Sequence, residues 1–93
     1  MPSKTYTVDQ IAKQLGVNIS EIREKRKLIE AIIETRKVKK ISQAKLAKKV
    51  GVTQGRIAQI ESKIGTYNIT FDILFNILRI LGVEIKITTK KAA

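Results

Sequence analysis

The most informative pattern in this chain of 93 residues is Ile41-Ser-Gln-Ala-Lys-Leu-Ala-Lys-Lys-Val-Gly-Val-Thr-Gln-Gly-Arg-Ile-Ala-Gln-Ile-Glu61. It predicts two short helices, Gln43–Val50 and about Gln54–Ser62, each preceded by a hydroxyl residue that can cap its first turn. Gly51 accepts the positive φ of the tight turn between them, and the small side chain of Ala47 lets the two helices approach closely. The pattern therefore predicts a helix–turn–helix.

The second short helix is expected to have an inward and an outward side. Ile57 and Ile60 fall on the side that anchors the helix in the core. Gln and Arg side chains on the other side suit the edges of adenine and guanine in a major groove, which indicates a helix that reads bases in DNA. The residues on this outward side are Gln54, Gly55, Arg56, Gln59 and Lys63.

The charge of the chain indicates a polyanionic partner. Lys and Arg number 19 against 8 Asp and Glu, which gives a net charge of +11. Eight of the 19 cationic residues lie between Glu34 and Glu61, a window that has no acidic residue and contains both short helices. Most of the charge is lysine, which favours phosphate contact irrespective of sequence. We therefore predict nucleic acid as the partner, ahead of a membrane surface.

Composition argues against several other classes of protein. The absence of Cys and His removes disulfides, thiol nucleophiles, the usual general base and the usual metal ligands. The eight carboxylates are spread along helices, and so short a chain does not easily enclose a pocket with paired acids. No signal peptide is evident, and polar residues interrupt the apolar stretch Phe71–Val83. We expect a cytoplasmic, nucleoid-associated protein that is not an enzyme and needs no metal or cofactor.

Two helices are expected before the motif. The pattern Thr7–Gln10 fits a capping box that opens a short helix ending near Leu15. A second capping box, Asn18–Glu21, opens a longer helix through about Arg36. These two helices would lead directly into the helix–turn–helix.

One more helix is expected after the motif. Residues Lys63–Ile69 are predicted to form a loop, and Thr70 then opens a helix that runs to Leu81 and ends at Gly82. This last helix is apolar on nearly every side, which predicts that it is buried all round. In so small a domain, part of that burial is expected to come from another chain.

The segment after the last helix has the alternation of a strand. In Val83-Glu-Ile-Lys-Ile-Thr88, the apolar residues Val83, Ile85 and Ile87 share one face. A lone strand cannot satisfy its backbone groups, so this one is expected to pair with its own copy in a dimer or to join a partner's sheet. The alternative is that the segment continues the last helix.

The chain is expected to divide into three parts. Residues 1–19 would form an N-terminal arm with a short helix, residues 20–88 the DNA-binding domain, and residues 89–93 a frayed tail. Overlapping the arm, Ile11–Ile22 repeats the pattern of Leu46–Ile57, so a second reading head is an alternative. It is disfavoured because its second helix would turn acidic residues toward phosphates, and a partner-binding arm fits better.

The Ile41–Glu61 pattern resembles the helix–turn–helix of the Cro and phage-repressor (XRE-type) family, and the resemblance covers roughly residues 20–88. It implies an all-α, lambda-repressor-like fold of five helices, here followed by a short C-terminal β-strand. Arg36 and Glu61 match a structural ion pair of the family. The DNA contacts that the resemblance implies fall on Gln43, Lys45, Lys48, Thr53, Gln54, Gly55, Arg56, Gln59, Ser62 and Lys63.

The resemblance also implies how these contacts divide. Gln43 would bind a phosphate, Gln54 and Gln59 would face base edges with Arg56 beside them, and the residues just after the second helix would touch the DNA backbone. Two positions depart from the family pattern. Gly55 stands where the family often has a polar base reader, and Lys63 stands where a glycine often follows the glutamate.

Two further features are similar to HigA-like antitoxins. They are the long charged helix Glu21–Arg36 and the ending Leu81–Thr88. This similarity implies a homodimeric repressor that binds a double-stranded operator, regulates its own operon and neutralises a small ribonuclease toxin. The alternatives are a module that mainly neutralises a partner toxin, and a stand-alone phage-type repressor. A role in binding single-stranded RNA is disfavoured because few aromatic residues are present to stack on bases.

Overall fold

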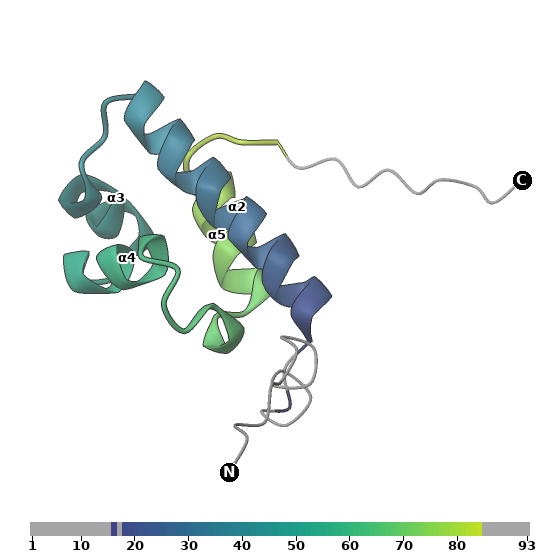
Figure 1. The fold of residues 1–93 in the computed structure, drawn as a ribbon. Helices are drawn as coiled ribbons and strands as arrows, with labels where there is room; N and C mark the ends of the chain where they lie inside the picture. Colours follow the sequence, from purple (N-terminus) through teal and green to yellow (C-terminus); the bar gives the residue numbers. More distant parts are fainter. Residues whose placement is uncertain (1–15, 17, 85–93) are drawn as a thin grey trace, which may run out of the picture.

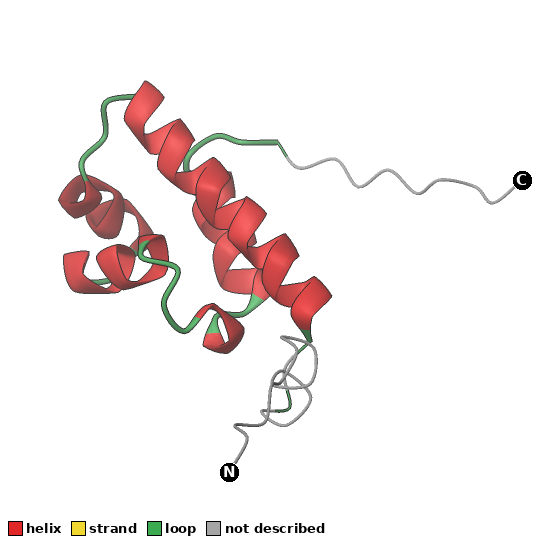
Figure 2. Ribbon diagram, in the orientation of Figure 1, coloured by secondary structure: helices red, strands yellow, loops and turns green. Residues whose placement is uncertain are grey.

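The computed structural model describes residues 16 and 18–84 of the chain. This part is all-helical, and Figure 2 shows helix and loop but no strand within it. The short helix expected to end near Leu15 lies outside the described residues. The elements are α2 (Ile19–Val38), α3 (Gln43–Val50), α4 (Gln54–Glu61), the 3-10 turn η1 (Thr66–Asn68) and α5 (Phe71–Ile80) (Figure 1).

Each of these four α-helices begins at a side-chain cap, as the sequence predicts. In every case the capping oxygen accepts a hydrogen bond from the backbone N–H three residues later, which satisfies one of the free donors of the first turn. The four starting points are therefore fixed by local chemistry. The cap and donor pairs are Asn18 with Glu21, Ser42 with Lys45, Thr53 with Arg56, and Thr70 with Ile73.

In two cases the glycine that was predicted to end a helix does so. Gly51 (φ 86°) ends α3 and Gly82 (φ 83°) ends the turn after α5. The end of α2 differs, since the helix runs to Val38 instead of about Arg36. Lys40 takes the left-handed conformation there, with a φ of 55°. A Schellman turn thus closes α2 without a glycine.

The core lies where the two longer helices meet the helix–turn–helix. Helices α2 and α5 lie side by side, and α3 and α4 pack against this pair (Figure 1). Ala47, Ile57 and Ile60 are all buried, as predicted, so the opposite face of α4 is turned outward. The buried apolar residues are Ile29, Ile32, Leu46, Ala47, Ile57, Ile60, Ile69, Leu74, Ile77, Leu78 and Leu81.

The described chain alone does not bury the last helix all round, and the cover expected from another chain stays a prediction. Asp72, Asn76 and Arg79 form an exposed stripe on α5, and Ile73 beside them is 36% exposed. The guanidinium of Arg79 donates a hydrogen bond of 2.8 Å to the Asn76 side-chain oxygen. The reason is geometric: the other helices pack against only part of the circumference of α5.

The predicted loop Lys63–Ile69 contains the short helix η1. The Ile69 and Thr66 side chains are both buried, which ties the segment to the core at two points. Successive i→i+3 hydrogen bonds, including one of 3.1 Å from the Ile69 N–H to the Thr66 carbonyl, tighten the chain between them. The expectation of an irregular loop was therefore wrong for Thr66–Asn68.

The first residue of the predicted C-terminal strand, Val83, takes part in the turn that closes α5. The Val83 N–H donates a hydrogen bond of 2.9 Å to the Leu78 carbonyl, and the Val83 side chain packs against the core. Ile85 and Ile87 lie outside the described residues, so the strand remains a prediction. Within residues 16 and 18–84, no helix is both long enough and apolar enough to cross a membrane.

Candidate nucleic-acid interface

The outward face of α4 carries three polar side chains that the sequence analysis singled out. Gln54 and Gln59 are exposed, and Arg56 is half-buried. One guanidinium nitrogen of Arg56 donates a hydrogen bond of 3.0 Å to the side-chain oxygen of Gln59. The other N–H donors of these two side chains form no hydrogen bond among the described residues. Such donors match the O6 and N7 acceptors of guanine in a major groove.

Gly55 leaves the first turn of α4 open. It has ordinary helical backbone, and a Cβ built there would meet nothing closer than the Thr53 hydroxyl at 3.9 Å. No steric contact within the described protein therefore requires glycine at this position. Its effect is to expose the backbone of α4 beside Gln54, where a ligand could approach closely.

A shallow groove lies between α3 and the start of α4. Its volume is about 450 Å³. Two small side chains and two lysines of α3 contribute to its lining. The groove is lined by Ala44, Lys45, Ala47, Lys48, Val52 and Gln54.

An ion pair joins the beginning and the end of the motif. The Arg36 guanidinium contacts both Glu61 carboxylate oxygens at 2.8 Å, and the side chains are 13% and 7% exposed. The third guanidinium nitrogen donates to the Ile41 carbonyl at 3.0 Å. The hydrogen bond with Glu61 raises the pKa of Arg36 above its ordinary value. Arg36 therefore fixes the chain entering α3 as well as α4.

Glu61 also holds Gln43, at the start of α3. The Gln43 amide nitrogen donates a hydrogen bond of 3.1 Å to a Glu61 carboxylate oxygen. This contact orients a side chain that is expected to bind phosphate and leaves its second N–H available. One carboxylate thus links α2, α3 and α4.

Several of the cationic side chains in the window between Glu34 and Glu61 are available to an outside partner. Lys39 is not one of them, because its ammonium donates to the Leu81 carbonyl and joins the ends of α2 and α5. Five others are exposed and take no part in a side-chain hydrogen bond or ion pair within the described residues. These are Lys37, Lys40, Lys45, Lys48 and Lys49.

The two expected contact residues just after α4 are engaged within the protein. The Ser62 hydroxyl donates to the Gln59 carbonyl at 2.6 Å and accepts from the Ile64 N–H at 3.2 Å. The Lys63 ammonium lies 2.8 Å from a Glu30 carboxylate oxygen on α2. Their contacts with DNA stay predictions, and the pairing of Lys63 with Glu30 was not anticipated.

Sequence reasoning also missed a buried lysine in α2. Lys25 is only 4% exposed. Its ammonium lies 3.2 Å from a Glu21 carboxylate oxygen and 5.3 Å from the centre of the Phe71 ring. The available signal was its position, since Lys25 falls on the same helical stripe as Ile29 and Ile32.

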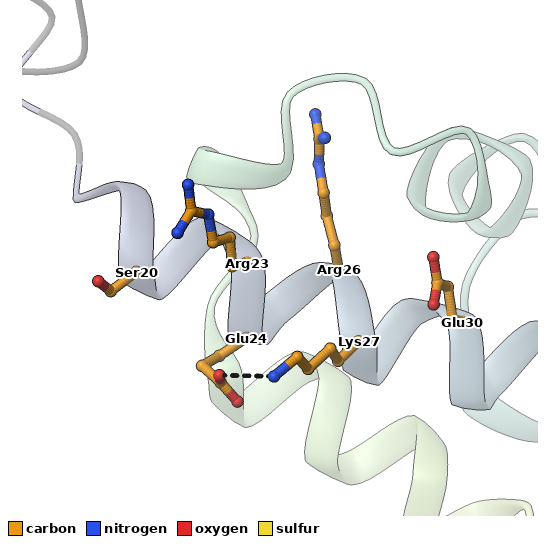
Figure 3. Close-up of a pocket in the computed structure, with 6 residues that line it drawn as sticks. All are labelled: Ser20, Arg23, Glu24, Arg26, Lys27 and Glu30. Carbon is orange, nitrogen blue, oxygen red and sulfur yellow. Dashed lines mark hydrogen bonds and ion pairs between the residues drawn. The ribbon is translucent and has the colours of Figure 1, made fainter. Parts of the chain in front are cut away.

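A second surface feature lies on the N-terminal half of α2. A pocket of about 460 Å³ is open there, and Figure 3 shows that Arg23, Arg26 and Glu30 project on one side of the helix. The Lys27 side chain extends toward Glu24 and pairs with it at 3.2 Å (Figure 3). The pocket is lined by Ser20, Arg23, Glu24, Arg26, Lys27 and Glu30. No group of three acidic residues that could hold a metal ion occurs in the part of the chain that the structure describes.

Comparison with models of protein families identified the central part of the chain. A family model described as Helix-turn-helix matches residues 32–87, which include the end of α2 and all of α3, α4 and α5. The matched segment is more than half of the chain and contains the whole outward face of α4. The comparisons with curated proteins and with solved structures found no match.

Proposed function

The chain belongs to the helix–turn–helix family of Cro/C1-type DNA-binding domains, and from that premise we propose that it is a sequence-specific transcriptional repressor. The observation that carries the proposal is the two-sided character of α4. Ile57 and Ile60 are 1% and 2% exposed and fix the helix in the core. The opposite side carries the side chains that suit base edges.

The proposed contacts divide into two kinds. Gln43, Lys45 and Lys48 on α3 bind phosphates and set the position of the protein on the duplex without reading sequence. Helix α4 enters the major groove, where Gln54, Arg56 and Gln59 read bases. Thr53 and Gly55 bring the start of the helix close to the DNA backbone. Ser62 and Lys63 remain candidates for contact with the following phosphates.

We further propose that two copies bind one operator. Each subunit reads half of a near-palindromic site, with half-site centres about 34 Å apart. The exposed stripe of α5 around Ile73 supports a protein contact there, and the alternating segment with Val83, Ile85 and Ile87 supports pairing between copies. Sedimentation of the wild type and Ile73→Lys tests the first surface: loss of the dimer in the variant is expected. An unchanged dimer would exclude this part of α5.

A specific observation favours a second role as an antitoxin. Residues Ile19–Ala31 of α2 precede the matched family segment and add an exposed, pocketed surface to the DNA-binding fold. This supports a protein partner, together with the similarity to HigA-like antitoxins. A partner toxin that co-purifies after joint expression of two neighbouring genes would support it, provided that Arg23→Ala weakens the complex. Without a partner, the stand-alone repressor is the better description.

The decisive experiment is selection of bound sequences from random double-stranded DNA. It must be done at a stated salt concentration, because phosphate contacts make all affinities fall with salt. We expect a near-palindromic sequence to be enriched by the wild type. Gln54→Ala should enrich a degenerate version of it. Failure of the wild type to enrich any sequence would contradict the proposal.

A further inference from the structure

The pairing of Lys63 with Glu30 places an acidic side chain next to the proposed interface. Lys63 directly follows Ser62, the C-cap of α4, and its ammonium lies 2.8 Å from the Glu30 carboxylate. The two side chains are 33% and 63% exposed, so neither is shielded from an incoming ligand. In Figure 3, Glu30 and Arg26 project on the same side of α2.

The backbone directs Lys63 toward α2. Lys63 has a φ of 62°, and its carbonyl accepts a hydrogen bond of 2.9 Å from the hydroxyl of Thr66, which is itself buried. These features fix the direction in which the side chain leaves the chain. The contact also changes the acidity of the carboxylate: the hydrogen bond from Lys63 lowers the pKa of Glu30 below its ordinary value.

We infer that Glu30 limits the affinity of the protein for DNA by holding the Lys63 ammonium that would otherwise bind a phosphate at the end of α4. The inference rests on the proposed function. An ammonium that already contacts a carboxylate gains less from a phosphate, because it must give up one anion to take the other. Since phosphate contact is blind to sequence, the effect applies to every duplex. Glu30 thereby becomes a determinant of affinity that touches no DNA.

The expected size of the effect follows from the exposure of the pair. Exposed ion pairs of this kind correspond to about a two- to fivefold change in an equilibrium constant. Release of Lys63 to one phosphate should also make the dependence of log affinity on log salt steeper by about one. Both effects are measurable with fluorescently labelled duplexes.

The chain offers a matched control for the change in net charge. Glu34 lies four residues after Glu30 on α2, is exposed, and forms no ion pair among the described residues. Glu34→Gln therefore adds the same charge on the same helix without releasing Lys63. Lys63→Met removes the ammonium but keeps an unbranched side chain at the same left-handed position. The backbone strain at residue 63 is therefore the same in the variant and in the wild type.

The experiment compares dissociation constants for a random duplex over a salt series. Glu30→Gln should bind about two- to fivefold more tightly than wild type, with the steeper salt dependence. Glu34→Gln should give a clearly smaller gain. In the Lys63→Met background, Glu30→Gln should give no more than the Glu34→Gln effect. NMR titration should show a higher Glu30 pKa in Lys63→Met than in wild type.

Two results would overturn the inference while leaving the proposed function intact. One is an equal gain in affinity from Glu30→Gln and Glu34→Gln. The other is a full Glu30→Gln gain that persists in the Lys63→Met background. If the wild type and Glu30→Gln both fail to bind any duplex at low salt, the proposed function and the inference fall together.

Discussion

The Arg36 guanidinium and the Glu61 carboxylate meet with two hydrogen bonds of 2.8 Å across 25 positions of the sequence. Their side chains are 13% and 7% exposed, so both charges have lost most of their water. A bidentate pair of this kind has a defined geometry as well as a favourable energy. It connects the end of α4 to α2 and therefore sets the position of the outward face of α4 relative to the rest of the fold.

Glu61→Gln should lower the free energy of unfolding by about 3 kcal/mol, because it leaves the nearly buried Arg36 without a counter-charge. Urea denaturation followed by circular dichroism measures the loss. Glu34→Gln is the control, since that exposed carboxylate has no partner among the described residues and its removal should change stability by less than about 0.5 kcal/mol. Equal stabilities of Glu61→Gln and wild type would contradict a structural role for the pair.

Two glycines in the motif should respond to alanine in opposite directions. Gly55→Ala should raise stability by about 0.5–1 kcal/mol, because the backbone there is helical and a methyl group meets no obstacle. Gly51→Ala should lower it by about 1 kcal/mol or more, because a φ of 86° strains any residue with a Cβ. Thermal denaturation of both variants tests whether Gly55→Ala raises the stability and Gly51→Ala lowers it.

The same Gly55→Ala variant tests how closely the backbone of α4 approaches DNA. If the approach is close, the variant should bind operator less tightly although it is more stable. Unchanged affinity would mean that Gly55 is only tolerated at this position. In that case the glycine would have no role in recognition.

The parts of the fold that the sequence predicts correctly are those set by local chemistry. Asn18, Ser42, Thr53 and Thr70 each cap a helix through a contact three residues away, and such a contact can be read from spacing alone. The burial of Ile57 follows equally from helical periodicity. For the same reason, the residue types on the outward face of α4 could be identified before the structure was considered.

The features that escaped prediction depend on contacts between distant segments. Lys63 and Glu30 are 33 residues apart, and no local pattern links them. The end of α2 was misjudged because Lys40 adopts a left-handed conformation that glycine usually provides.

The Glu30–Lys63 pair should contribute to stability at neutral pH and not in acid. Because the pKa of Glu30 is lowered from its ordinary value of 4.5, the contribution is present above that value and is lost as pH falls through the lower, folded-state pKa. Denaturation of wild type and Glu30→Gln at about pH 7 and about pH 3 checks the sign. The wild type should be the more stable protein at the higher pH, and the difference should shrink at the lower pH. A difference that is the same at both values would show that the pair does not titrate as described.

Base reading and phosphate binding should separate when Gln54 on α4 and Lys48 on α3 are changed individually. Gln54→Ala should cost about 1–3 kcal/mol of binding free energy at particular operator positions and little on random DNA. Lys48→Ala should weaken operator and random duplexes alike and reduce the salt slope by about one, because a phosphate contact is blind to sequence. Anisotropy titrations of both variants on both duplexes, over a salt series, measure the two effects side by side. Equal losses on operator and random DNA for Gln54→Ala would remove this side chain from the reading surface, and an operator-specific loss for Lys48→Ala would place α3 in base recognition.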